Sequence, residues 1–292
     1  MKRYSPTAAK QRGMAIISAL LIAAVVAVLA GAMLTRQSVF TRSLEAEQLR
    51  VQGQWLLQGG LERSRQMLWE ARQKEVLTRL DQPWAQAQGG AFEGQIEDEQ
   101  GKFNLRNLVN RQQPDTEQLQ SFERLCRLIG VDPAVSRRIS QRVIASYEQN
   151  GVPAKYPMLR NLDDLSGIDG LDPALLRRLR TYISVLPSNT WVNGNTASAE
   201  VLSAVVPQLS LAHARGVLAE RDSGRWFINR GDFVNRLHLP QVAVDSVQVG
   251  ITSEWFRLHG QARREQRRVT LDALLHRPED RPPRVIWSRV GV

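Results

Sequence analysis

Residues 14–34 form an apolar run without a charged side chain, and this run of 21 residues constrains the fold more than any other feature. A helix needs about 20 apolar residues to cross a bilayer, so the run is long enough to span a membrane. No acidic residue precedes it, but four basic residues do: Lys2, Arg3, Lys10 and Arg12. Because positive charge is retained on the cytoplasmic side, the 258 residues after Leu34 are predicted to lie outside the cytoplasm.

The basic leader meets the apolar run at Gly13 and Met14. An ordinary secretory signal has an apolar core of about 7–15 residues, followed by a small-residue cleavage site. Residues 30–32, Ala-Gly-Ala, imitate such a site, but the apolar run continues past them to Leu34. A cleaved ordinary signal and a simple uncleaved anchor both stay open. The more specific hypothesis is processing at the Gly13/Met14 junction itself.

The charge of the chain limits the classes of partner. The formal net charge is +10, and removing the four leader charges leaves +6 after Met14. Such basicity suits nucleic acid, anionic lipid or an acidic protein. Arginine is dense near the C-terminus, where a solvated basic face is the favoured interpretation unless the fold gathers these residues: Arg263, Arg264, Arg267, Arg268, Arg277, Arg281, Arg284 and Arg289.

The cysteine and histidine residues form no catalytic or metal-binding pattern. Cys126 is the only cysteine, so an intrachain disulfide and a cysteine metal site are excluded. It lies between Leu125 and Leu128, which predicts a small buried thiol. The histidines have no metal-ligand or triad spacing and are predicted to be surface or packing residues: His213, His238, His259 and His276.

Apolar residues recur at helical spacing beyond the membrane run, from Phe40 to Leu77. No proline interrupts the chain from Met14 to about Leu80, so one long helix is predicted, ending at residues 81–83, Asp-Gln-Pro. Gly59 and Gly60 weaken this helix by about 1 kcal/mol each relative to alanine, and indicate close packing or a bend.

Strand patterns flank a long helical stretch. Residues 91–109 alternate apolar and polar side chains around a turn at residues 99–101, which predicts a short hairpin. Residues 115–240 contain a series of helix starts and are predicted to be almost wholly helical. Three short strands are predicted after about Val249. This order predicts a helical block inserted into a sheet.

The helical stretch contains a repeat. Residues 129–143 and 168–183 share a glycine-containing turn, an Asp-Pro-Ala helix start and paired arginines. Residues 193–233 are related, and they resemble helix–hairpin–helix modules, whose hairpin glycines let backbone N–H groups approach phosphate. A membrane-anchored DNA receptor, similar to competence proteins, is therefore the alternative function. A single-pass envelope scaffold is a third hypothesis.

The turns of the repeat argue against DNA contacts. The third turn, residues 206–210, lacks both glycines, and Asp132 and Asp172 start the helices after the other two turns. An aspartate at a helix start caps the N–H groups and repels phosphate. These turns are interpreted as structural caps, and nucleic acid is not an expected partner.

Taken together, these features resemble the K-type minor pseudopilins of type II secretion (general secretion pathway protein K, GspK family). The resemblance covers nearly the whole chain, and the order of segments is more specific than any single motif. It is carried by RGMAIISALLIAAVVAVLA, GKFNLRNL, NLDDLSGIDGLDPALLRRLRTYISVLP, NGNTASAEVL and SEWFRLHGQARREQRRVTLDALLHR.

The resemblance implies an α+β pseudopilin fold with a long N-terminal helix, a small antiparallel sheet and a large inserted all-helical domain. The implied segments are a cleaved leader (1–13), the membrane part (14–34) and periplasmic part (35–82) of the helix, the first part of the sheet (89–110), the inserted domain (111–248) and the closing strands (249–292).

The implied function is that of a non-enzymatic subunit at the pseudopilus tip, which initiates or caps assembly for protein export across the outer membrane. The chain would cross the bacterial inner membrane once, with its N-terminus in the cytoplasm and its bulk in the periplasm. The implied partners are the I-type and J-type minor pseudopilins, other pseudopilins, the prepilin peptidase and the inner membrane, with secreted proteins as further candidates.

The resemblance also assigns roles near the N-terminus. A prepilin peptidase would cut after Gly13 and methylate the new N-terminal Met14. Most pilins and pseudopilins carry a glutamate four residues after the first mature residue, where it meets a neighbour's N-terminus during filament growth. Ser18 occupies that position, as suits a K-type subunit with nothing above it. An anchor helix with no assembly role is the simpler interpretation.

Some K-type members bind calcium in the helical domain, so calcium is the one cofactor that the resemblance raises. Asp163, Asp164 and Asp169 offer oxygens in a short segment. Calcium takes six to eight oxygen ligands, so solvated loop acids are the favoured interpretation of these three residues. The disulfide of some members is not carried over, because Cys126 has no second cysteine to join.

Overall fold

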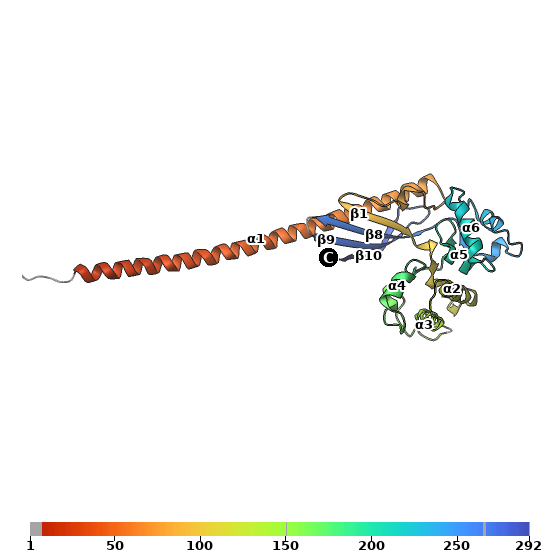
Figure 1. Ribbon diagram of the computed structural model, residues 1–292, viewed down its shortest axis with the longest axis horizontal. Coiled ribbons are helices and arrows are strands. Elements are labelled where there is room, and N and C mark those ends of the chain that lie inside the picture. The colour runs from red at the N-terminus through yellow and green to blue at the C-terminus, as the bar shows by residue number, and fades with distance from the viewer. Residues whose placement is uncertain (1–7, 150, 265–266, 292) are drawn as a thin grey trace, which may run out of the picture. The chain divides into compact units, whose positions relative to one another are not determined.

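The computed structural model describes residues 8–149, 151–264 and 267–291 (Figure 1). Contacts divide the chain into two compact units, Met1–Trp55 and Leu56–Val292. Helix α1, Ala8–Lys74, begins in the first unit and ends in the second. The second unit contains the sheet and the helical insertion.

The described part of the first unit, residues 8–55, is the N-terminal part of α1. Its segment Ile16–Thr41 is long and apolar enough to cross a membrane, and none of it is buried within the protein. This is the one such helix among the residues that the structure describes.

The sheet of the second unit has four antiparallel strands in the order β1-β8-β9-β10 (Figure 1). The strands are β1 (Phe92–Asp98), β8 (Trp255–Arg264), β9 (Arg267–His276) and β10 (Arg284–Gly291). Alternate residues of β8 point to opposite faces. Phe256 and Leu258 pack in one core cluster with Leu57 and Leu68 of α1, so α1 covers this face of the sheet.

Three glycines make room for the ring of Phe92 between α1 and the sheet. A Cβ atom placed at Gly60 would lie 2.3 Å from that ring, and one at Gly94 or Gly260 would lie 2.4 Å from it. Gly60 therefore marks close packing, one of the two outcomes predicted for it. A Cβ atom at Gly59 would meet nothing within 4 Å.

The insertion lies between β1 and β8 and has its own apolar core, in which Phe103 stacks on Phe122. Its helices are α2 (Thr116–Leu128), α3 (Pro133–Ile144), α4 (Pro173–Leu179), α5 (Ala199–Val205), α6 (Leu211–Asp222) and α7 (Arg230–Arg236). Short 3-10 helices are η1 (Pro83–Ala85), before β1, and η2 (Glu99–Gly101), η3 (Leu105–Leu108), η4 (Leu162–Leu165) and η5 (Val244–Ser246).

Pairs of two-residue strands connect the parts of the insertion. Strands β2 and β5 pair in parallel, as do β6 and β7, whereas β3 and β4 are antiparallel. Their bounds are β2 (Phe103–Asn104), β3 (Val109–Asn110), β4 (Gln113–Pro114), β5 (Ile183–Ser184), β6 (Val192–Asn193) and β7 (Val249–Gly250). The α+β fold class is confirmed, together with the order of long helix, sheet and helical insertion.

Three local predictions were wrong. Helix α1 ends at Lys74 and does not continue to residue 82, because Thr78 is drawn into contacts with the sheet region, where its N–H donates to the carbonyl of Ile251 at 3.1 Å. Residues 91–109 form no hairpin: β1 pairs with β8, and β2 pairs with β5. Residues 115–240 are less helical than predicted, since residues 145–149 and 151–161 lie outside α-helix.

Candidate functional site

The predicted processing site falls at the N-terminal end of α1. Gly13 and Met14 lie in the helical backbone, and the side chain of Met14 lies outside the described side chains. Ser18 is exposed on the helix. Cleavage after Gly13 and methylation of Met14 stay predictions.

A buried polar junction, centred on Asp98 at the end of β1, joins the sheet to the insertion. Asp98 is 7% exposed. Its Oδ2 accepts hydrogen bonds from the side chains of Asn193 (3.0 Å), Thr196 (2.6 Å) and Ser253 (2.6 Å), and its Oδ1 accepts one from the N–H of Gln100 (2.9 Å). The carboxylate thus holds the first residues of the insertion, its middle and the segment that leads into β8.

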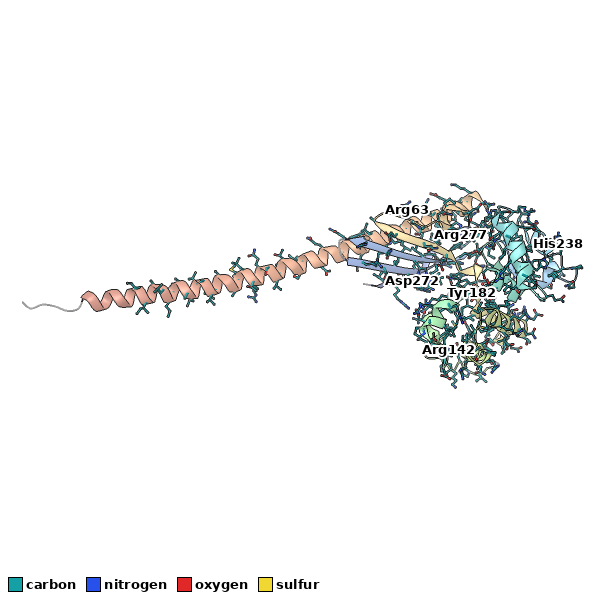
Figure 2. The ribbon with its side chains drawn as sticks, in the orientation of Figure 1. Arg63, Arg142, Tyr182, His238, Asp272 and Arg277 are labelled. Atoms are coloured by element: carbon teal, nitrogen blue, oxygen red, sulfur yellow. The ribbon has the colours of Figure 1, made fainter. Side chains whose placement is uncertain are left out.

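Arg277 forms the other half of this polar junction (Figure 2). Its side chain is 2% exposed and donates hydrogen bonds to Thr78 Oγ1 at 2.7 Å and to the carbonyl of Ser253 at 2.8 Å. The guanidinium carbon also lies 4.6 Å from the ring centroid of Phe256. Ser253 therefore bonds to both Asp98 and Arg277, and links the two charged residues.

Burial shifts both charged groups of the polar junction toward neutrality. Burial raises the pKa of Asp98, against the hydrogen bonds from Ser253, Thr196, Gln100 and Asn193, which favour the carboxylate. Burial also lowers the pKa of Arg277 to about 10, although the charge of Asp98 opposes that shift. Since the partners of both groups belong to the fold itself, we interpret the polar junction as architectural.

The motif at residues 193–197, Asn-Gly-Asn-Thr-Ala, serves this polar junction. Asn193 and Thr196 bind Asp98, and Asn195 binds the backbone of Phe227 through both of its amide atoms, each at 2.9 Å. Sequence reasoning connected the motif with DNA-binding modules and missed its role here. The alternation of apolar and polar residues that ends at Asp98 predicts a strand, but it does not indicate which residues bind the Asp98 carboxylate.

The face of the sheet away from α1 carries ion pairs that are satisfied within the chain. Arg257 binds both oxygens of Asp272, at 2.8 and 2.6 Å, and His259 lies 3.2 Å from the same carboxylate. Lys102 pairs with Glu97 at 3.0 Å and with Glu99 at 2.7 Å. A cavity of about 600 Å³ opens beside these residues.

The pKa of Asp272 is lowered. Its partial burial acts in the other direction, but the hydrogen bonds and the charge of Arg257 outweigh it. The side chain is labelled on the sheet in Figure 2. Paired charges of this kind hold the sheet face and leave no unpaired cation for an anionic ligand within this group.

The turns of the repeat act as caps, as predicted. Asp132 accepts a hydrogen bond from the N–H of Ala134, and Asp172 accepts one from that of Leu175, both at 2.7 Å. In the third turn Gln208 occupies the left-handed region, with φ of 65°, where a binding loop would use glycine.

The arginines of the two repeats bind each other's turns. Arg138 donates to the carbonyl of Asp169 at 3.0 Å, and Arg178 donates to the carbonyl of Gly130 at 3.1 Å. These two arginines therefore brace the insertion, and their geometry does not support phosphate contacts.

The candidate calcium ligands do not converge. Asp163 pairs with Arg180 and, at 3.3 Å, with Arg289 of β10. Asp169 pairs with Arg138 at 3.2 Å.

Asp164 instead accepts the backbone N–H groups of Arg160 and Asn161, at 2.7 and 3.2 Å, and so closes a capping box at η4. Within residues 8–149, 151–264 and 267–291, no group of three or more His, Cys, Asp or Glu side chains could hold a metal ion. Asp163, Asp164 and Asp169 thus do not come together as one ligand set among the described residues.

The thiol of Cys126 is buried, with 1% of the residue exposed, as predicted. Burial raises its pKa to about 11, which leaves it protonated at neutral pH and unsuited to nucleophilic chemistry. Two of the histidines lie beside carboxylates, His259 beside Asp272 and His276 beside Glu254.

Comparison with known proteins identifies what this arrangement is similar to. Two family models, both described as type II secretion system protein K, match residues 101–188 and 192–252. Both ranges lie between β1 and β8, within the insertion. The chain is 27% identical to type II secretion system protein K of Pseudomonas aeruginosa, over 96% of this chain and 93% of that protein. It is 26% identical to the Klebsiella pneumoniae protein of the same name, over 86% of each.

A solved structure has a similar fold. It is a chain of the GspK–GspI–GspJ complex from the type 2 secretion system of enterotoxigenic Escherichia coli, with a TM-score of 0.63. The two chains are 17% identical, and the match covers 85% of this chain and 99% of that one.

Proposed function

This chain belongs to the family of type II secretion system protein K, and on that premise we propose that it stands at the tip of a pseudopilus. Members of the family are minor pseudopilins, which are structural subunits and not enzymes. At the tip, the chain would initiate or cap assembly for protein export across the outer membrane. The observation that carries the proposal is the insertion between β1 and β8, because both family matches fall inside it.

The proposed partners are the I-type and J-type minor pseudopilins. The similar solved chain belongs to a complex of GspK with GspI and GspJ, and the shared fold supports an equivalent assembly for this chain. Other pseudopilins would follow below this group in the filament.

The apolar helix is consistent with an anchor in the inner membrane. We propose that the leader stays in the cytoplasm and that the second unit lies in the periplasm, because four basic residues precede the apolar run. Cleavage after Gly13 would then make Met14 the methylated N-terminus. Ser18 leaves the mature helix without the buried carboxylate that is costly in a membrane unless it is paired.

Mass spectrometry of the N-terminus tests this proposal. The chain isolated from cells that express a prepilin peptidase should begin with N-methylated Met14. The variant Gly13→Val should keep its leader, whereas Gly31→Val, inside the apolar run, should still be processed. An intact Met1 in the wild-type chain would contradict the pseudopilin processing.

Nucleic acid is not favoured by the structure, because Arg138 and Arg178 bind protein carbonyls. The full chain in detergent should therefore bind duplex DNA weakly and lose that binding at moderate salt. Tight binding that is abolished by Gly170→Ala would favour the DNA receptor instead.

A further inference from the structure

Arginines face each other at the end of the β8–β9 hairpin where β8 leads into β9. Arg263 lies opposite Arg268 in the register of the two strands, and Arg264 lies opposite Arg267. Side chains directly opposite in an antiparallel pair lie on one face, with Cβ atoms about 4.5–5.5 Å apart. The side chains of Arg263 and Arg268, which we call the arginine tip, are both exposed. The fold thus gathers these two of the eight C-terminal arginines.

Two neighbouring acids on the described part of this face, Glu93 and Asp272, are engaged elsewhere. Glu93 accepts a hydrogen bond from Gln261, and Asp272 is held by Arg257 and His259. Among the described side chains, no carboxylate lies within 4.0 Å of either arginine of the tip. Like charges directly opposite each other destabilise a strand pair, so the tip opposes the stability of the free chain.

The arginine tip lies at a particular end of the second unit. Ala262 and Val269, which precede and follow the tip, pack in one cluster with Leu57 and Leu61 of α1. Leu57 and Leu61 belong to the first turns of α1 in this unit, so the tip lies at the end of the sheet that this part of α1 covers.

We propose that the arginine tip binds an acidic surface of the adjacent pseudopilus subunit. The proposal rests on the proposed function above and names a contact within it. Carboxylates of the partner would bridge the two guanidinium groups in charge-assisted hydrogen bonds. Binding would also remove the repulsion between Arg263 and Arg268, so the feature that destabilises the free chain favours the complex.

The test compares charge removal at the tip with charge removal elsewhere. The variant Arg263→Gln/Arg268→Gln loses the two charges of the tip, and Arg263→Lys/Arg268→Lys keeps them. Arg137→Gln/Arg177→Gln is the matched control, because both arginines are exposed on the insertion. Each full-length chain is placed in nanodiscs of neutral lipid and, separately, of anionic lipid, and is titrated with the I-type and J-type minor pseudopilins at low and high salt.

Removing the charges of the tip should weaken binding about tenfold and flatten its salt dependence. The lysine variant should bind within about threefold of the wild type, and the control should bind like the wild type. The glutamine variant of the tip should also melt at a higher temperature than the wild type when no partner is present. Arginines that are only solvated at the surface would not give weaker partner binding together with a higher melting temperature of the free chain.

Three results would overturn the proposal. If the tip variant binds the partners as the wild type does, the arginine tip is not the contact, and the proposed function stands. If the variant binds less well only in nanodiscs of anionic lipid, the tip recognises phospholipid and not protein. If the wild-type chain binds neither partner, the proposed function itself fails, and this inference fails with it.

Discussion

The base of the β8–β9 hairpin and its arginine tip use the same residue type in opposite ways. At the base, Arg257 binds Asp272 with two hydrogen bonds, and Arg277 donates to buried oxygens of Thr78 and Ser253. At the arginine tip, Arg263 faces Arg268. The difference lies in the acceptors: those at the base come from β9 itself, from the segment after α1 and from the segment before β8, whereas no carboxylate among the described side chains lies within 4.0 Å of Arg263 or Arg268. Charge therefore supports the fold at one end of a hairpin and is available to a partner at the other.

The largest effect should come from Asp98→Ala at the base. This change removes the charge of Asp98 from the surroundings of the buried Arg277, and it removes the acceptor of Asn193 and Thr196. Breaking a buried charged network in this way costs about 3–5 kcal/mol. Urea unfolding of the full chain in detergent would measure it. Asp98→Asn keeps one oxygen acceptor and should lose less, while a loss below about 1 kcal/mol for the alanine variant would mean that the base does not depend on this carboxylate.

A second test addresses the middle of the hairpin, where Phe92 packs over Gly260. Gly60→Ala would place a Cβ atom 2.3 Å from the Phe92 ring and should destabilise by about 1–3 kcal/mol. Gly59→Ala is the matched control, because it meets nothing within 4 Å, and it should stabilise the helix by up to about 1 kcal/mol. Equal shifts of the thermal midpoint for both variants would contradict the packing described here.

A third test uses pH at the base. Because the pKa of Asp272 is lowered in the fold, its contribution is present above the ordinary carboxyl pKa, which is about 3.9, and is lost as pH falls through the folded value. Asp272→Asn should cost about 1–2 kcal/mol at pH 7 and should flatten the loss of stability between pH 5 and pH 3. A wild-type and a variant chain that lose stability in parallel on acidification would show that this ion pair contributes nothing.

The contribution of Asp98 to stability should change with pH in the opposite direction. Its pKa is raised in the fold, so its stabilising contribution is present at low pH and is lost as pH rises through the folded value. Comparing the pH profiles of Asp98→Asn and Asp272→Asn therefore separates the buried polar junction from the ion pair on the open face.

A smaller effect on stability is expected from changes at the arginine tip. Arg263→Gln/Arg268→Gln should stabilise the free chain by about 0.2–1 kcal/mol at low salt, and the gain should shrink as salt screens the repulsion. Differential scanning fluorimetry at two salt concentrations would measure it. Destabilisation by the same change would show that the tip has a stabilising partner within the chain, and the contrast between base and tip would disappear.

The smallest effect should come from chelation of divalent cations. Asp163 and Asp169 are held by arginines, and Asp164 is used in a capping box, so EGTA should leave the thermal midpoint unchanged. Arg180→Gln should lower it, because Asp163 then loses one of its two arginine partners. A large drop on chelation, reversed by calcium, would contradict this account of the three carboxylates.

Local features of this fold could be predicted from the sequence, and long-range ones could not. The apolar anchor, the caps at Asp132 and Asp172 and the burial of Cys126 each depend on a few adjacent residues, and the structure agrees with them. The alternation in β1 predicts a strand, but it does not identify the partner strand. Local alternation alone therefore predicts a hairpin within residues 91–109, whereas the partner of β1 is β8, about 160 residues away.

The polar junction was missed for the same reason. Asp98, Asn193 and Ser253 are each ordinary polar residues in their own segments, and only the folded chain brings them within hydrogen-bond distance. The end of α1 was placed too late because helical periodicity continues to Leu77, whereas the tertiary contacts of Thr78 end the helix earlier.

The insertion also determines the order in which this chain can fold. Pairing β1 with β8 closes a loop of about 160 residues, and such closure is slow when the chain between is unfolded. The parallel pairs β2–β5 and β6–β7 shorten that distance, because they bring Asp98 next to Ser253 once the insertion is formed. We expect pulsed hydrogen exchange to protect α2 and α5 before β1. Until β8 and β9 are in place, Leu57 and Leu68 of α1 have no sheet to cover them. A newly made subunit therefore exposes an apolar helix face, which is prone to non-specific association, until its C-terminal strands are synthesised and paired.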